Sequence, residues 1–157
     1  MRSFLAICVF AIVGALPARA SDIEFVRVWP GWRDAASFER ISEYFTGQEN
    51  TGREVVLRTH PDQRDGFYYL VRVKNSGAEQ TGAKFVLHVI MPSGPEPKVL
   101  TFNTTVPSRA KVFQLGLTGA DWPNSETHPV AWLLELKSAD DQLLASAQSF
   151  LWEKPTK

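Results

Sequence analysis

The feature that most constrains the fold of this chain is a strict alternation of apolar and other side chains in short runs. Every second residue from Phe67 to Val73 is large and apolar, and the opposite series ends in Arg72 and Lys74. The same alternation returns from Ala83 onward. A β-strand places successive side chains on opposite faces, so a period of two predicts strands packed by one face on a core.

Short runs of this kind, separated by turn residues, extend over most of the chain. We expect eight strands, at residues 23–29, 54–59, 67–74, 83–91, 98–106, 111–117, 129–137 and 143–152. Pro30 and Gly31 are expected to end the first strand, since proline cannot continue a ladder. Strands at such short, regular spacing predict a mostly-β fold, an antiparallel β-sandwich.

One segment has a different period. Between residues 34 and 45, Phe38, Ile41 and Phe45 recur at helical spacing, and Asp34 is a suitable N-cap. We therefore predict one short N-terminal α-helix beside the sandwich. We detect no repeat or linker, so residues 21–157 are interpreted as a single domain.

Two of these runs carry a family resemblance. The stretch YYLVRVKNSG at residues 68–77, followed by FVLHVIMPSG at residues 85–94, resembles the middle hairpin of bacterial immunoglobulin-like or fibronectin type III-like sandwich modules. The resemblance extends over roughly residues 54–152 as a strand pattern, without the cysteine pair of true immunoglobulin domains. It implies an immunoglobulin-like fold and a role in binding, spacing or scaffolding.

The first twenty residues have the features of a secretory signal peptide. Arg2 precedes a nearly uninterrupted apolar run, and Ala18 and Ala20 are the small residues that signal peptidase reads. The alternative is a retained membrane anchor, but the run at residues 4–16 is shorter than the roughly 20 apolar residues that span a bilayer. We expect cleavage after Ala20, no membrane span in the mature chain, and a secreted or periplasmic location in a bacterium.

Removal of this peptide changes the chemistry of the chain. It takes away Cys8, the only cysteine, together with two of the 17 basic residues and none of the 17 acidic ones. The mature domain then has no thiol for a disulfide, a metal or a nucleophile. Its mildly acidic balance argues against nucleic acid as a partner, because phosphate-binding domains gather an excess of Lys and Arg.

The motifs of common enzymes are missing. We find no G-x-S-x-G turn, no phosphate-binding P-loop and no dinucleotide fingerprint. The pairs Asp62/Asp65 and Asp140/Asp141 have the residue type that glycosidases use, but aspartate is also favoured in turns. We therefore predict no catalytic residues, no cofactor and no enzyme activity.

The three histidines are not spaced as metal ligands. His60 and His128 each precede a proline in a polar loop, which favours solvated side chains. His88 lies within a predicted strand, and we expect it to be half-buried and hydrogen-bonded. We therefore predict no metal site.

Tryptophan is the strongest sign of ligand binding. Trp29, Trp32 and Trp122 fall beside Pro30–Gly31 or Pro123, at strand ends or in loops, whereas Trp132 alternates with core residues. A tryptophan ring can stack on a sugar or fill a partner's pocket. The alternative is that the three rings close the ends of the sandwich or attach the helix to a sheet.

We therefore predict an exported, non-enzymatic binding or accessory module of the bacterial envelope. The alternative is a carbohydrate-binding module that uses Trp29, Trp32 and Trp122 as platforms. A protein partner or a glycan could be the ligand, since an edge strand can also pair with another chain.

Overall fold

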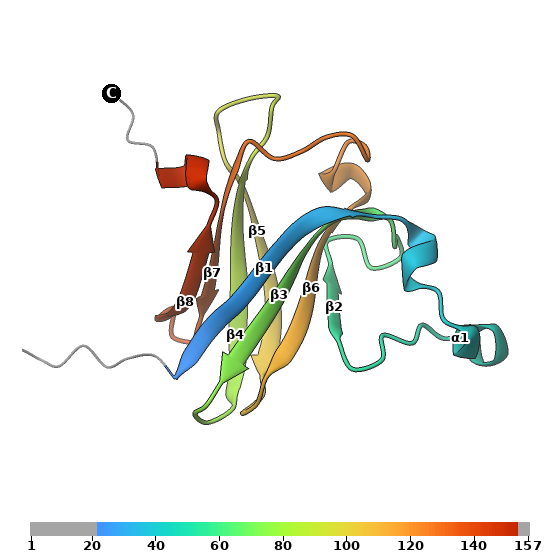
Figure 1. Ribbon diagram of the computed structural model, residues 1–157, viewed down its shortest axis with the longest axis horizontal. Helices are drawn as coiled ribbons and strands as arrows, with labels where there is room; N and C mark the ends of the chain where they lie inside the picture. Colours follow the sequence, from blue (N-terminus) through green and yellow to red (C-terminus); the bar gives the residue numbers. More distant parts are fainter. Residues whose placement is uncertain (1–21, 154–157) are drawn as a thin grey trace, which may run out of the picture.

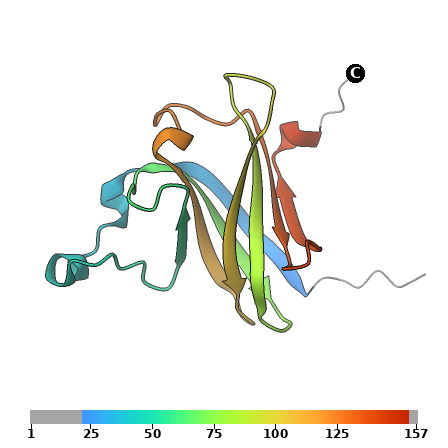
Figure 2. The ribbon, with the colours of Figure 1, turned by 180° about the vertical axis from the view of Figure 1, so that it is seen from behind.

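The described part of the chain folds as a β-sandwich of two four-stranded sheets (Figures 1 and 2). The computed structural model describes residues 22–153, so the predicted signal peptide at residues 1–20 lies outside the described residues. One sheet has the order β1-β3-β6-β2 and the other β5-β4-β7-β8. The strands are β1 (Ile23–Arg33), β2 (Val55–Arg58), β3 (Gly66–Asn75), β4 (Gln80–Ile90), β5 (Lys98–Val106), β6 (Lys111–Thr118), β7 (Ala131–Lys137) and β8 (Leu143–Gln148).

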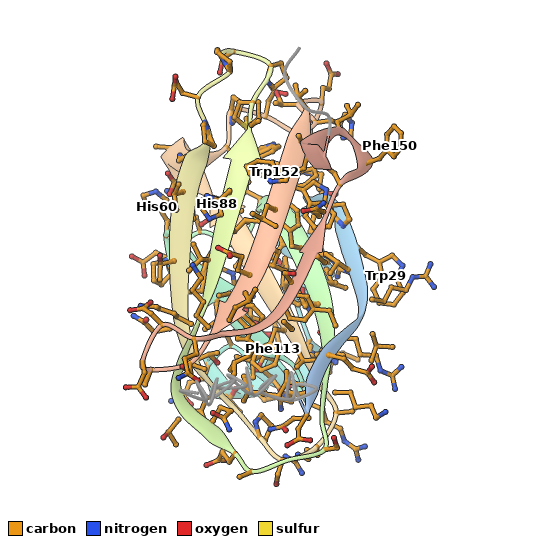
Figure 3. The ribbon with its side chains drawn as sticks, turned by 90° about the vertical axis from the view of Figure 1, so that its left-hand side faces the viewer. Trp29, His60, His88, Phe113, Phe150 and Trp152 are labelled. Atoms are coloured by element: carbon orange, nitrogen blue, oxygen red, sulfur yellow. The ribbon has the colours of Figure 1, made fainter. Side chains whose placement is uncertain are left out.

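The core lies between the sheets and follows the predicted alternation. On β3 the side chains of Phe67, Tyr69, Val71 and Val73 are buried in it. Phe113 of β6 is fully buried and packs on Phe85 of β4, with ring centroids 5.1 Å apart (Figure 3). The prediction of a mostly-β sandwich is confirmed, with antiparallel pairing everywhere in the described strands except between β2 and β6.

All eight predicted strands are present, and the two largest corrections to their ends are at β1 and β8. β1 continues through Pro30 and Gly31 to Arg33, because an edge strand needs ladder hydrogen bonds on one side only. β8 ends at Gln148, and Phe150–Glu153 forms a 3-10 turn, η3, instead of strand. Ser149 begins this turn, since its carbonyl accepts a hydrogen bond from the amide of Trp152 at 3.0 Å.

The pairing of β2 departs from the predicted antiparallel pattern. β2 lies beside β6 and runs parallel to it, with Val56 opposite Gln114 and Arg58 opposite Gly116. β1 and β2 are consecutive strands, yet they occupy opposite edges of their sheet. The chain between them, residues 34–54, therefore has to cross the sheet, and we call it the cover segment.

The predicted helix is wrong in its extent. The cover segment forms a 3-10 turn, η1 (Ala35–Phe38), and a six-residue helix, α1 (Ile41–Thr46), separated by extended backbone at Glu39 and Arg40. Asp34 takes the N-cap position of η1 but makes no side-chain cap hydrogen bond. The helix breaks because only Phe38 is buried, and α1 projects beside the sandwich (Figure 1).

Candidate functional site

The outer face of sheet β1-β3-β6-β2 carries one row of paired residues that crosses all four strands. Trp29 lies opposite Leu70, Leu70 opposite Gln114, and Gln114 opposite Val56. Paired residues of neighbouring strands share a face, so their side chains form one continuous surface. Two hollows lie along this row.

The first hollow lies over β1. It measures about 400 Å³ and is lined by residues 29–33 together with Leu70. The ring of Trp29 is 42% exposed and points away from the sandwich (Figure 3). The guanidinium of Arg27 lies 4.2 Å from the ring centroid, close enough for a cation–π contact.

Gly31 shapes the space beside that ring. It is two residues from Trp29 on the same face of β1, and a Cβ built there would meet no atom within 4 Å. The surface between Trp29 and Arg33 therefore has no side chain over it. Such a surface gives a flat ligand access to the tryptophan ring.

The other two tryptophans of the predicted site are placed differently. Trp32 packs against the core, and its indole nitrogen donates to the carboxylate of Asp34 at 2.9 Å. Trp122 is only 4% exposed and stacks on Phe67, with ring centroids 4.3 Å apart. Trp29 and Trp32 thus border the same hollow, whereas Trp122 closes an end of the sandwich and is not part of the candidate site.

The cover segment is fixed above the sheet by a network around Tyr68. Phe38 packs on the Tyr68 ring at a centroid distance of 4.8 Å. The Nε of Arg58 donates to the Tyr68 hydroxyl at 2.8 Å, and that hydroxyl donates to the carbonyl of Arg64 at 2.6 Å. Burial raises the pKa of Tyr68, against the opposing effect of Arg58, so the hydroxyl keeps its proton at neutral pH.

Two ion pairs attach the far part of the cover segment. Arg58, whose side chain is 6% exposed, binds both carboxylate oxygens of Glu49 at 2.8 and 2.6 Å. Arg64 binds Glu43 at 2.7 Å. The hydrogen bond from Arg58 lowers the pKa of Glu49, and the backbone amide of Asn50 lowers that of Glu43, so both carboxylates are charged at neutral pH.

The second hollow lies between the cover segment and the sheet. It measures about 200 Å³, and the ionisable side chains that line it are Arg33, Arg40, Glu49 and Glu54. Arg33 also lines the first hollow, so the two adjoin.

Gln114 of β6 lies against this second hollow and is the unusual group there. The residue is 4% exposed, and its Nε2 donates to the carboxylate of Glu54. Its Oε1 is buried without a hydrogen-bond partner among the described residues. Buried side-chain oxygens nearly always accept a hydrogen bond, so a donor that reached this atom from the hollow would satisfy it.

The sequence interpretation missed Gln114. It alternates with Phe113 and Leu115, a pattern that predicts an ordinary solvent-facing position on a strand. Its burial depends on the cover segment, whose path over the sheet is not a local property. The only local sign of this burial was a neutral amide side chain, instead of a charged one, between two core residues.

The histidines lie away from both hollows. His60 contacts the Asp121 carboxylate at 3.2 Å, and Asp121 also binds Lys98. Burial opposes ionisation of Asp121, but hydrogen bonds from Lys98 and Thr59 outweigh it and lower its pKa. The prediction of a freely solvated His60 is therefore corrected, because the turn after β6 brings Asp121 to it.

His88 and Asp141, one member of the predicted carboxylate pairs, fill structural positions. The Nε2 of His88 lies 3.3 Å from Glu135 and the side chain is half-buried, as predicted. Asp141, at a positive φ of 61°, binds Lys84 at 2.7 Å in the turn between β7 and β8. Among residues 22–153 we find no group of three or more His, Cys, Asp or Glu side chains arranged to hold a metal ion.

No protein-family model matches the chain, and no curated protein matches it either. One solved structure that matches is that of an immunoglobulin-like protein from Pseudomonas aeruginosa, with 14% identity over 83% of this chain and 97% of that one, at a TM-score of 0.34. Within the described part of this chain, no helix is long and apolar enough to cross a membrane.

Proposed function

We propose that this chain is an exported, non-enzymatic binding module of the bacterial envelope. Its ligand-binding face is the outer face of sheet β1-β3-β6-β2. The observation that carries the proposal is the pair of adjoining hollows on that face, which share Arg33 and combine an exposed ring with buried polar groups. A concave surface with a few convergent polar groups on a rigid sheet is the usual form of a ligand site.

A saccharide is the ligand class that the first hollow supports best. The exposed face of Trp29 is flat and rigid, and the bare backbone at Gly31 leaves room beside it. Sugar rings have apolar faces that stack on tryptophan and hydroxyls that bond to polar neighbours. Arg33 is the polar neighbour on the same strand.

The positions of the histidines, Glu43 and Glu49 support a binding role over a catalytic one. None of the three histidines lines either hollow. The carboxylates of Glu43 and Glu49 are engaged by Arg64 and Arg58, so they serve to attach the cover segment. General acid–base catalysis needs a group that can exchange a proton with the ligand, and these carboxylates are held ionised.

The test of ligand class is a glycan array with the mature chain, followed by titration of tryptophan fluorescence with the glycans it retains. Trp29→Ala should weaken binding by about tenfold or more, as expected for an anchoring aromatic residue. Phe150→Ala is the matched control, because Phe150 is also an exposed aromatic that points outward, but from η3 (Figure 3). Equal affinities for the two variants would refute the assignment of this face.

The test of export is the mass of the protein isolated from the cell envelope. Cleavage after Ala20 would leave Ser21 as the first residue. Recovery of the full-length chain from the cytoplasm would contradict the proposal. Recovery of a protein partner, and of no glycan, in a pull-down from the envelope would replace the saccharide by a protein ligand.

A further inference from the structure

We infer that the saccharide bound by this face is acidic, with its anionic group held by Arg33 and Arg40 and a hydroxyl hydrogen-bonded to the Oε1 of Gln114. The inference rests on the proposed function, because it names the ligand class of the same site. It is carried by the second hollow, where unpaired charged side chains and an unpartnered amide oxygen lie together.

The charges that line the second hollow are unequally paired. Glu49 is bound by Arg58, and Glu54 accepts a hydrogen bond from Gln114. Arg33 and Arg40 form no ion pair within 4.0 Å in the described part of the chain. Glu54 likewise forms no ion pair, so the unpaired charges around the hollow sum to one positive charge, which favours an anionic ligand. A guanidinium binds a carboxylate through two parallel hydrogen bonds.

Arg40 is held at this hollow by the path of the cover segment. Its guanidinium lies against Gly52, where a Cβ would stand 3.3 Å from one of the terminal nitrogens. Gly52 has a φ of 64°, which glycine adopts without strain. The turn at Gly52 thus allows the guanidinium to approach the backbone closely.

The amide of Gln114 adds a requirement that a simple anion cannot meet. Its Nε2 is used by Glu54, so the free atom is an acceptor and needs a donor. A fully ionised carboxylate or phosphate carries no hydrogen to donate, whereas a sugar hydroxyl does. An anionic group for the arginines and a hydroxyl for Gln114 are both present on one acidic sugar residue.

The size and position of the hollows fit a short chain of sugars. The second hollow, at about 200 Å³, has room for a single residue, and it adjoins the larger hollow at Arg33. A neighbouring sugar would then lie over Gly31 against Trp29. The acidic residue gives charge selectivity, and the stacked residue gives affinity for sugars of either charge.

Matched pairs of oligosaccharides test the inference. We would compare oligogalacturonate with its methyl ester, and sialyllactose with lactose, by isothermal titration of the mature chain at low salt. In at least one pair the acidic member should bind about tenfold tighter or more, and added salt should reduce the difference. Equal binding of the acidic and neutral members in both pairs would overturn the inference and leave saccharide binding intact.

Two arginine variants test whether the preference for the acidic oligosaccharide arises at the second hollow. Arg40 is exposed, so Arg40→Gln should fold normally, and it should bring the affinity for the acidic member close to that for the neutral one. Arg53→Gln is the matched control, since Arg53 is also exposed and does not line this hollow. A similar loss in both variants would mean a general effect of positive charge, and an unchanged preference in Arg40→Gln would exclude the arginine site; either result overturns the inference.

The outcomes separate the two proposals. If both members of each pair bind equally and Trp29→Ala abolishes that binding, the saccharide module stands and the acidic site falls. If no oligosaccharide binds at all, both proposals fail. Tighter acidic binding that is lost in Arg40→Gln and retained in Arg53→Gln supports both.

Discussion

The interior of the sandwich and the cover segment are held in place by different forces. Between the sheets, packing is apolar and close, with rings such as Phe113 fully buried. In the cover segment Phe38 is buried, whereas Ile41, Tyr44 and Phe45 are exposed, Tyr44 to 90%. Ion pairs from Arg58 and Arg64 attach that segment to the sheet.

Because of this difference, the candidate site lies between a rigid sheet and a cover segment whose attachment depends on charge. Apolar burial depends little on pH or salt, but charge pairs near the surface weaken as carboxylates are protonated or ions screen them. The second hollow lies between the two regions. Its shape should therefore respond to conditions that leave the sandwich folded.

The largest expected effect is on the interior. Phe113→Ala should lower the free energy of unfolding by about 3–5 kcal/mol, because it removes a fully buried ring and leaves a cavity. Phe45→Ala, in the exposed part of α1, should change it by less than about 0.5 kcal/mol. Urea denaturation followed by fluorescence measures both, and comparable losses would mean that α1 packs on the protein in solution.

The second effect concerns the attachment of the cover segment. Arg58→Met should cost about 2 kcal/mol, because it leaves Glu49 with only the longer 3.9 Å contact to Arg64 and removes a donor from the Tyr68 hydroxyl. Amide exchange should rise in residues 34–54 and remain slow in β3 and β4. The control is Lys74→Met, which breaks an exposed pair with Glu24 and should have little effect.

The alternation of side chains predicted the sandwich because it is a local property. Strands β3 and β4 can be read directly from Phe67, Tyr69, Phe85 and Leu87, which recur at every second position. The path of the cover segment has no such local pattern. Its helical spacing is genuine, but Phe38 is buried by Tyr68, a contact that forms only after folding.

The candidate site was predictable to a smaller extent for the same reason. Trp29 was identified from its position beside Pro30–Gly31, and it is exposed. Trp122 has a similar turn context, but it stacks on Phe67 from a distant part of the chain. Two other features depend on the path of the chain from β1 to β2, namely the burial of Gln114 and the proximity of Arg33 to Arg40. No short-range sequence pattern predicts that path.

The third effect is a response of the cover segment to acid. The pKa values of Glu43 and Glu49 are lowered from an ordinary 4.5 in the folded protein. Their contribution to stability is therefore present above that value and is lost as the pH falls through the lower folded values. We expect the protection of amides in residues 34–54, measured against the intrinsic exchange rate at each pH, to fall below about pH 4 while β3 and β4 stay protected. A single cooperative loss of protection in both regions would show that they do not separate.

The smallest expected effect on stability is that of Gly31→Ala, which we compare with the same substitution at Gly116. Gly31 and Gly116 lie on either side of Tyr68 in one row across the outer face of the sheet. A Cβ at Gly116 would collide with the Tyr68 ring, whereas one at Gly31 would meet nothing within 4 Å. Gly31→Ala should therefore change the free energy of unfolding by less than about 0.5 kcal/mol.

Gly31→Ala should weaken binding although it leaves stability nearly unchanged. The added methyl would stand beside the Trp29 ring, in the space assigned to the stacked sugar, so affinity should fall for acidic and neutral oligosaccharides alike. Gly116→Ala, under the cover segment, should instead destabilise the protein measurably. If Gly31→Ala leaves both stability and binding unchanged, the sugar does not lie over the β1 edge, and the ligand would have to be confined to the hollow beside Gln114.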